Sequence, residues 1–550
     1  MSPSRGATLT VLCTVALMIV LDSTIVAVAI PAIQRDLGFT PAGVAWVVNG
    51  YLVAFAGLLL LAGRLGDLLG ARRIFLAGLL VFTSASLLCG LAPSAGLLVT
   101  GRFVQGVGGA LASAVVLGMI VRLYPEPGPQ ARAMGIFSFT QAGGAAIGFV
   151  VGGVLTDLAG WPAIFLINVP VGVVAWFLGR RLLPHALTAA PTTTATAPAT
   201  GPASATGAAA ATGPAAATGP VAGVEAATAG RRLDLLGALL VTSGLSLGVY
   251  AIVAAGEPAA AAPAWLLGVG ALLLVIAFLV RQGRAPVPLV PLRLLRRPWL
   301  LAANAAMILI LAAGMGFQFV NTLFLQRVMG FDTLRTGLGF LPTPIVIGVV
   351  SLFVTARLTS RFGPRRVLLA GLALFAGGLL LLVRIPANPS YAVDVLPAII
   401  VMGLGVGLTV PAIMMLAMAG ASDEDAGLVS GLTNTAQQAG AALGLAVLAA
   451  VSAGRTSTRL AAGVPETVAL RDGYSLAFLT AGAFIVGALL IVLTALRRPP
   501  APEVPLPAEE LPPVDVERPL PAVDGEQRSP FVETPAEPGR PAVAACSAER

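Results

Sequence analysis

The feature that most constrains this chain is a series of long apolar runs that recurs along most of its length. There are about fourteen runs, each close to the roughly 20 residues that a helix needs to cross a bilayer. They lie near residues 7–30, 43–62, 74–92, 97–121, 134–156, 163–183, 235–255, 264–280, 299–320, 337–356, 367–383, 395–418, 430–452 and 475–496. Lipid offers no partner to free backbone groups, so such spans must be helices. The sequence therefore predicts an all-α polytopic membrane protein.

Composition and arginine placement support this class and predict an orientation. Charged residues make up 11% of the chain, against about 25% in a typical soluble domain. If the N-terminus is cytoplasmic, most arginine-rich loops also fall on the cytoplasmic side. We therefore expect a multi-pass protein of the cytoplasmic membrane with both termini in the cytoplasm. The same bias accounts for the net charge of +8, so no nucleic-acid partner is expected.

Several residue types are missing or isolated, and this excludes whole classes of function. The chain has no lysine, so it cannot form the phosphate-binding loop of an ATP-driven pump. Its three cysteines show no metal-ligand or disulfide spacing, and its single histidine, His185, lies in a linker. A membrane enzyme would need nucleophile–base pairs or clustered ligands, and a channel would need a filter or charge ring. We expect no metal and favour a secondary transporter over an enzyme or a channel.

An internal repeat divides the chain. The loop "GRLGDLLGARRIFLAG" (63–78) matches "ARLTSRFGPRRVLLAG" (356–371), and "GAAIG" (144–148) matches "GAALG" (440–444). Two six-span halves related by parallel repetition are typical of transporters that rock around a central site. The predicted parts are an N-terminal six-helix half (1–183), a flexible cytoplasmic linker (184–232), two extra transmembrane helices (233–285), a C-terminal six-helix half (286–498) and a disordered Pro/Glu-rich tail (499–550).

A carboxylate in the first span is the strongest functional candidate. Asp22 lies about 13 Å below the outer end of its predicted helix, and Arg102 lies about 10 Å below the outer start of the fourth. A charge at bilayer depth is costly and needs a partner or a function. The pair could be a proton site, because ionisation of the acid depends on whether the pair is formed and hydrated. It could also be a static ion pair that holds two helices together.

Other polar residues inside the spans are candidates for a substrate cavity, although interhelical hydrogen bonding is the alternative for many of them. Asn434, Gln437 and Gln438 share one face of the thirteenth span, at i, i+3 and i+4. The remaining cavity candidates are Asn49, Gln105, Gln141, Asn304, Gln318 and Asn321.

At the level of motifs, the sequence resembles a known family. "GRLGDLLGARR" resembles the loop signature of the major facilitator superfamily. "LDSTIVAVAIPAI" (21–33), "RFVQGVGGA" (102–110), "GWPAIFLINVPVG" (160–172), "FLQRVMGFDTLRTGLGFLP" (324–342) and "GLVSGLTNTAQQAGAALGLAV" (427–447) resemble its 14-span drug:proton antiporters, the EmrB/QacA type of multidrug efflux transporter. The resemblance covers about residues 7–496. It departs from the family pattern at Ala27, Ala71, Phe149 and Pro162-Ala163, and Phe149 stands where the antiporter motif has proline.

The resemblance implies the major facilitator fold and export of small amphipathic or drug-like molecules by proton antiport with alternating access. The proton-motive force would drive transport without a cofactor, and the chain would act as a monomer whose partners are substrate, protons and the bilayer. Asp22 and Arg102 would couple transport to protons. The implied cytoplasmic gate is Gly63, Arg64, Asp67, Gly70, Arg72 and Arg73, and the antiporter-motif glycines are Gly144, Gly148, Gly152 and Gly153. A proton-coupled importer and a narrow-specificity metabolite exporter of the same fold remain alternatives.

Overall fold

The computed structural model describes residues 3–183, 234–255, 263–285, 288–386, 389–418 and 426–496, and every regular element in these ranges is a helix. The first part contains α1 (Pro3–Leu37), η1 (Gly43–Ala45), α2 (Trp46–Leu69), α3 (Ala71–Gly90), α4 (Ala95–Leu123), α5 (Pro127–Ala159), α6 (Pro162–Leu166) and α7 (Asn168–Leu182). The linker and tail that the sequence predicts lie outside the described residues.

The later elements follow the linker. They are α9 (Leu235–Ala255), α10 (Ala264–Arg284), α11 (Leu292–Leu295), α12 (Pro298–Arg327), α13 (Thr333–Phe340), α14 (Pro342–Val349), η3 (Val350–Thr355), α15 (Ala356–Phe362), α16 (Pro364–Val383), η4 (Tyr391–Val395), α17 (Leu396–Met418), α18 (Ala426–Ala461) and α19 (Glu466–Thr494). The tenth predicted span is thus one path built of α13, α14, η3 and α15, in which η3 is a π-helical segment.

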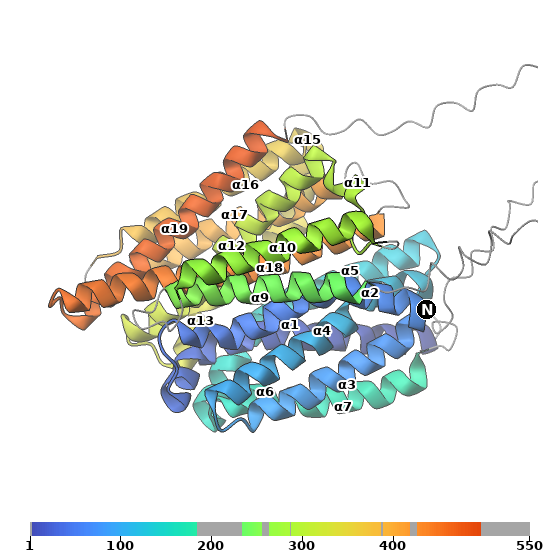
Figure 1. Cartoon of the computed structure of the whole chain (residues 1–550), viewed down its shortest axis with the longest axis horizontal. Helices are drawn as coiled ribbons and strands as arrows, with labels where there is room; N and C mark the ends of the chain where they lie inside the picture. The colour runs from blue at the N-terminus through green and yellow to red at the C-terminus, as the bar shows by residue number, and fades with distance from the viewer. Residues whose placement is uncertain are drawn as a thin grey trace, which may run out of the picture. The chain divides into compact units, whose positions relative to one another are not determined.

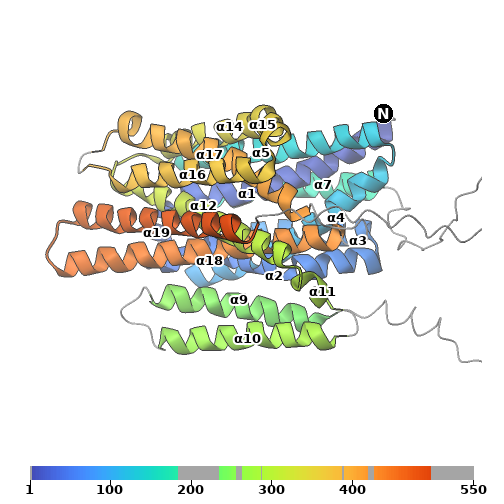
Figure 2. The same ribbon diagram turned by 90° about the horizontal axis from the view of Figure 1, so that it is seen from above.

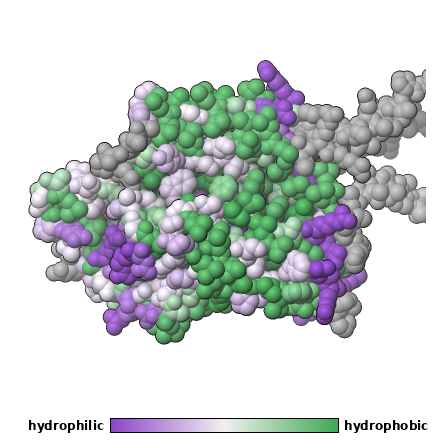
Figure 3. Space-filling view, turned by 60° about the horizontal axis from the view of Figure 1, so that its bottom comes forward, coloured by the Kyte–Doolittle hydropathy of each residue, from purple (hydrophilic) through white to green (hydrophobic). Residues whose placement is uncertain are grey.

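Fourteen helical segments of the described residues are long and apolar enough to cross a membrane, as the sequence predicts. Several extend beyond the predicted limits, because polar residues at their ends continue the helix outside the apolar run. Figure 3 shows a hydrophobic band between two regions where hydrophilic side chains gather, the pattern of a surface that contacts lipid in its middle and water at its ends.

The two six-helix halves pack by the same plan. In the first half α1 packs on α5, α3 on α4 and α7, and α2 on α4 (Figure 1). The equivalent pairs in the second half, α12 with α18, α16 with α17 and α19, and α14 with α17, are in contact too. The repeated sequences therefore form repeated structure.

Glycines in the repeated motifs permit close contacts between helices and tight turns between them. A methyl group on Gly148 of α5 would collide with Thr24 of α1, and one on Gly444 of α18 would collide with Ala312 of α12. Small residues at these positions let two helices approach closely. The repeated loops each turn at a glycine with positive φ, 94° at Gly70 and 80° at Gly363, a conformation that other residues rarely adopt.

The two extra helices form a hairpin beside the halves. α9 contacts both α2 and α18, whereas α10 packs mainly on α9 and lies outermost in Figure 2. The base of the hairpin is held by Asp234, which is buried. Its carboxylate accepts hydrogen bonds from the backbone N–H of Gly237 (2.9 Å), from Arg281 (3.1 Å) and from Gln282 (2.8 Å).

The halves are joined to each other near one end. We call the end where α1 begins and α7 ends the arginine-rich end, because Arg72, Arg180 and Arg181 lie there. At the opposite end, Gln326 of α12 donates to the carbonyl oxygen of Val28 (3.0 Å) and Arg327 donates to the amide oxygen of Gln34 (2.5 Å). Contacts between α5 and α13 also join the halves there, and α2 packs on α18 along another edge.

Candidate functional site

Asp22 of α1 and Arg102 of α4 form an ion pair inside the N-terminal half. Nη1 of Arg102 lies 2.5 Å from Oδ2 of Asp22, and both side chains are 0% exposed. Their predicted depths were similar, and the structure brings them into direct contact. Taking two charges out of water costs several kcal/mol per ion in proteins, so such a pair persists only if other polar groups complete its hydrogen bonding.

Neutral donors complete the shell of the Asp22 carboxylate. Its Oδ1 accepts hydrogen bonds from the amides of Gln105 (2.8 Å) and Asn168 (2.9 Å). The same two amides also donate to the hydroxyl oxygen of Ser86, at 2.7 and 3.1 Å. These residues come from α4, α7 and α3, so with α1 the network joins four helices, and the donors to the carboxylate itself come from α4 and α7. We call Asp22, Arg102, Gln105, Asn168 and Ser86 the Asp22 cluster.

Arg102 is held from several sides. Its Nε donates to the carbonyl oxygen of Val47 at 2.8 Å, and its Nη1 also donates to Gln105 Oε1 at 2.7 Å. The guanidinium carbon lies 4.6 Å from the ring centroid of Tyr51 and 5.7 Å from that of Phe165, within the range of cation–π attraction. Nη2 is buried with no hydrogen-bond partner among the described residues.

Protonation of Asp22 would change the polar contacts of this arrangement. In the observed state the charge of Asp22 is balanced by Arg102, and every group around it is oriented for an ionised carboxylate. A proton on Asp22 would cancel the attraction to Arg102 and turn one acceptor oxygen into a donor. Packing among α1, α3, α4 and α7 would then lose its main polar connection.

The other predicted polar residues do not join this cluster. Asn49 and Asn321 are fully buried, and within the described residues neither amide has a partner. Asn304 donates to the carbonyl oxygen of Leu300 in its own helix. Gln318 lines a small cavity between the halves together with Ser23 and Met315. Half-buried positions are held by Gln141, Asn434, Gln437 and Gln438. Gln105, predicted as a cavity residue, lies instead beside Asp22.

The predicted gate residues lie around the turn between α2 and α3, at the arginine-rich end. Arg64 donates to the carbonyl oxygen of Pro288 at 2.7 Å, in the segment before α11, and Arg72 donates to that of Arg180 at 2.7 Å. Asp67 and Arg73 are exposed. In this state, the hydrogen bonds donated by Arg64 and Arg72 therefore reach the segment that follows the hairpin and α7. Gly63 is half-buried, and Gly70 forms the turn itself.

The four antiporter-motif glycines serve two different interfaces. Gly144, Gly148 and Gly152 lie against α1, within the same half. A methyl group on Gly153 would instead lie 2.9 Å from the carbonyl oxygen of Thr333, in α13 of the other half. The motif thus packs α5 onto its own half and onto the opposite half at the same time.

Sequence reasoning missed two members of the Asp22 cluster. Asn168 lies in the stretch "FLINVPVG", where an amide among apolar residues was a usable signal. The sequence gives no comparable signal for Ser86. Serine is common in membrane helices, because its hydroxyl readily forms a hydrogen bond with a backbone carbonyl of the same helix.

Comparison with known proteins agrees with this architecture. The family model described as Major Facilitator Superfamily matches residues 12–445. The chain is 36% identical over 501 residues to a puromycin resistance protein of Streptomyces alboniger, covering 89% of this chain and 90% of that protein. It is 34% identical to a cephamycin export protein of Amycolatopsis lactamdurans, covering 90% and 93%.

A tetracenomycin C resistance and export protein of Streptomyces glaucescens is 32% identical over 80% of this chain and 74% of its own length. Among solved structures, a bacterial homologue of the human lysosomal transporter Spinster matches with a TM-score of 0.59 at 16% identity, covering 91% of this chain and all of that chain. This last likeness concerns the fold alone. The chain therefore belongs to the Major Facilitator Superfamily of transporters, alongside its 14-span drug exporters, and is not an enzyme.

Proposed function

We propose that this protein exports small amphipathic or drug-like molecules across the cytoplasmic membrane in exchange for protons. Asp22 carries the proton, and Arg102 stabilises its ionised form. The observation that carries the proposal is the burial of the Asp22 carboxylate among three hydrogen-bond donors from two other helices. Apolar helices can pack together without a buried charge, so a charge inside a span points to a function.

The proposed orientation places the arginine-rich end in the cytoplasm, following the positive-inside rule. The contacts of Gln326 and Arg327 with α1 then close the halves toward the outside. Alternating access requires these contacts to break when the gate at the arginine-rich end closes. We propose the monomer as the transporting unit.

Export is supported by the names of the relatives, which describe resistance to or export of antibiotics. Several of those names refer to one compound each. A narrow-specificity exporter is therefore the second candidate, and a proton-coupled importer of the same fold is the third. A panel of compounds tested for transport separates the first two.

The experiment is transport by the purified full chain in proteoliposomes with an imposed pH gradient. Puromycin and a set of structurally unrelated amphipathic compounds serve as substrates, and a pH-sensitive dye inside the vesicles reports proton movement. We expect substrate and protons to move in opposite directions. Co-movement in one direction would instead establish an importer.

Asp22→Asn provides the central variant, because asparagine keeps the size and hydrogen bonding of a protonated aspartate but cannot ionise. We expect it to lose gradient-driven transport while retaining substrate binding. Thr242→Val is a control for the loss of a buried polar group inside a span, because the Thr242 hydroxyl bonds only within α9 among the hydrogen bonds of the described residues, and it leaves the Asp22 cluster intact. If Asp22→Asn still concentrates substrate against its gradient at wild-type rates, Asp22 is not the proton carrier.

A further inference from the structure

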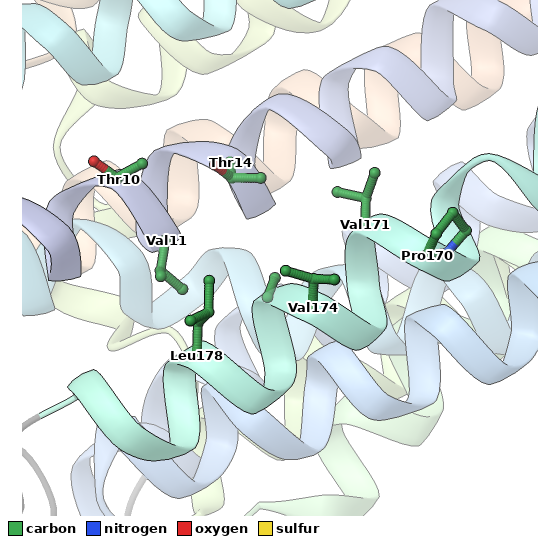
Figure 4. Close-up of a pocket in the computed structure, with 8 residues that line it drawn as sticks. Thr10, Val11, Thr14, Pro170, Val171, Val174 and Leu178 are labelled. Atoms are coloured by element: carbon green, nitrogen blue, oxygen red, sulfur yellow. The ribbon is translucent and has the colours of Figure 1, made fainter.

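A cavity of about 390 Å³ lies between α1 and α7, outside the Asp22 cluster (Figure 4). On α1 it is lined by Thr10, Val11 and Thr14. On α7 it is lined by Val171, Val174 and Leu178, together with Pro170 and Ala175. Its size falls in the range of about 300–1,000 Å³ that small-molecule sites occupy. We call it the α1–α7 groove.

The groove is open along its length on the outer surface of the bundle. Val174 is 57% exposed and Leu178 is 42% exposed, although both face α1 across the cavity. The groove is bounded toward the arginine-rich end, where the Thr8 hydroxyl donates to the carbonyl oxygen of Leu182 and ties the two helices together. It therefore lies at the lipid boundary, in the half of the membrane next to the arginine-rich end.

A cation lies on the face of α7 that lines the groove. Arg181 follows Leu178 by three residues, so the two side chains lie on one face, about 4.5 Å apart along the axis. Arg181 is exposed, and no hydrogen bond or ion pair to it occurs within the described residues. Arg180 differs, because its guanidinium carbon lies 4.8 Å from the ring centroid of Trp176, a residue that does not line the groove. The apolar α1–α7 groove thus ends next to the positive charge of Arg181.

We propose that the α1–α7 groove binds an anionic phospholipid of the membrane leaflet next to the arginine-rich end, with an acyl chain between the helices and the phosphate at Arg181. This site is independent of the proton and substrate pathway. Lipid tails are as apolar as the groove lining, so the chain is selected by shape and van der Waals packing rather than by hydrophobic transfer. The headgroup adds charge recognition, which depends on basic residues beside such a groove.

The lining favours a lipid chain over a transported drug. A drug-sized ligand is normally oriented by a few convergent polar groups. Here the polar groups are the hydroxyls of Thr10 and Thr14, and the Thr10 hydroxyl is already bonded to the carbonyl oxygen of Gly6. The apolar lining of the α1–α7 groove therefore offers little to orient a drug, whereas Arg181 can distinguish an anionic headgroup from a neutral one.

The test is native mass spectrometry of the full-length protein, purified in detergent and titrated with dioleoyl phosphatidylglycerol or with dioleoyl phosphatidylcholine. We expect a retained adduct of phosphatidylglycerol at lower lipid concentration than of phosphatidylcholine. Val174→Trp, which fills the groove, should abolish this adduct. Arg181→Gln should weaken phosphatidylglycerol binding about fivefold and leave phosphatidylcholine binding unchanged.

Matched controls come from the neighbouring residues of α7. Val173→Trp places the same ring on the same helix at an exposed position that does not line the groove, and Arg180→Gln removes a guanidinium that points elsewhere. Both should retain the wild-type adduct. Leu178→Trp serves as a second groove-filling variant, and each protein is first checked for monodispersity by size-exclusion chromatography.

Three results would overturn the proposal. Equal loss of the adduct in Val173→Trp and Val174→Trp would show only non-specific lipid around the bundle. Equal affinity of the two lipids in the wild type would remove Arg181 as a headgroup site. Loss of puromycin binding in Val174→Trp with unchanged phosphatidylglycerol binding would assign the groove to the substrate pathway instead.

Discussion

The ring of Phe149 stacks on the ring of Phe340, with centroids 4.8 Å apart and planes inclined by 9°, and so joins α5 of one half to α13 of the other. Both side chains are buried. Beside the stack, a methyl group on Gly337 would collide with the carbonyl oxygen of Phe149. The residue that departs from the family motif therefore forms part of the contact between the halves.

We expect Phe149→Leu to favour opening of the halves at the end opposite the arginine-rich end. Leucine keeps an apolar side chain but loses the stacking, worth about 0.5–1.5 kcal/mol beyond burial, so the open population should rise about two- to tenfold. The measurement is the rate at which an impermeant maleimide, added from that side, labels Met315→Cys in a cysteine-free background. Met315 lines the cavity between the halves.

Phe139→Leu is the control for this substitution. Phe139 lies on the same helix but is 68% exposed, so its replacement should not change the labelling rate. A labelling rate for Phe149→Leu equal to that of the control would mean that the stack does not hold the halves together.

Variants that remove one or both charges of the Asp22–Arg102 pair distinguish a proton-carrying site from a static ion pair. Arg102→Ala leaves a buried carboxylate without its counter-charge, which typically costs about 3–5 kcal/mol, so folded protein and driven transport should both fall. Asp22→Asn/Arg102→Gln removes both charges and should restore the yield of folded protein but not driven transport. The measurements are thermal unfolding and proteoliposome uptake. Recovery of driven transport in the double variant would instead identify a static ion pair.

Asp67→Asn should leave a folded protein with slower turnover. Asp67 is exposed in this state and already feels the charges of Arg122 and Arg64, and we expect its carboxylate to gain a further contact with a helix N-terminus of the other half when the arginine-rich end closes. A contact of that kind contributes up to about 1 kcal/mol, so its loss should shift the two access states by about fivefold. Asp67→Glu retains the charge and should retain more activity. Identical transport kinetics in wild type and Asp67→Asn would exclude a gating role.

Asp234 should stabilise the base of the α9–α10 hairpin in a pH-dependent way. Burial acts to raise the pKa of Asp234, but hydrogen bonds from Gly237, Gln282 and Arg281 outweigh it and hold the pKa below its usual value. A lowered pKa in the folded state means that the ionised carboxylate stabilises the fold at neutral pH. This contribution is lost as the pH falls through the folded pKa.

We therefore expect Asp234→Asn to lower the free energy of unfolding by about 1–3 kcal/mol at pH 7. The difference between the two proteins should begin to shrink only below about pH 4, the usual pKa of aspartate, and should vanish as the pH falls through the lowered folded pKa. Thermal unfolding in detergent at pH 7 and in steps from about pH 5 to about pH 2 measures this difference. Asp157→Asn, at an exposed aspartate, should have little effect at either pH. A constant difference between wild type and Asp234→Asn across this range would mean that ionisation of Asp234 does not contribute.

The sequence by itself determined the membrane class, the fourteen spans and the repeat. Each of these depends on local hydrophobicity or on short motifs, which can be recognised without knowing which residues they contact in the fold. It also singled out Asp22 and Arg102, since a charge in an apolar run is conspicuous and depth follows from helix rise.

Only the tertiary structure decided which side chains meet. The sequence did not show that the amides of Gln105 and Asn168 would both donate to Ser86 and Asp22, that Phe149 would stack on Phe340, or that α9 would pack against both α2 and α18. Within lipid, hydrophobicity sets which segments become helices but does not set how they pair, because every apolar face is equally soluble in the bilayer. Pairing is decided by shape, by glycines that permit close approach and by buried polar groups that need partners.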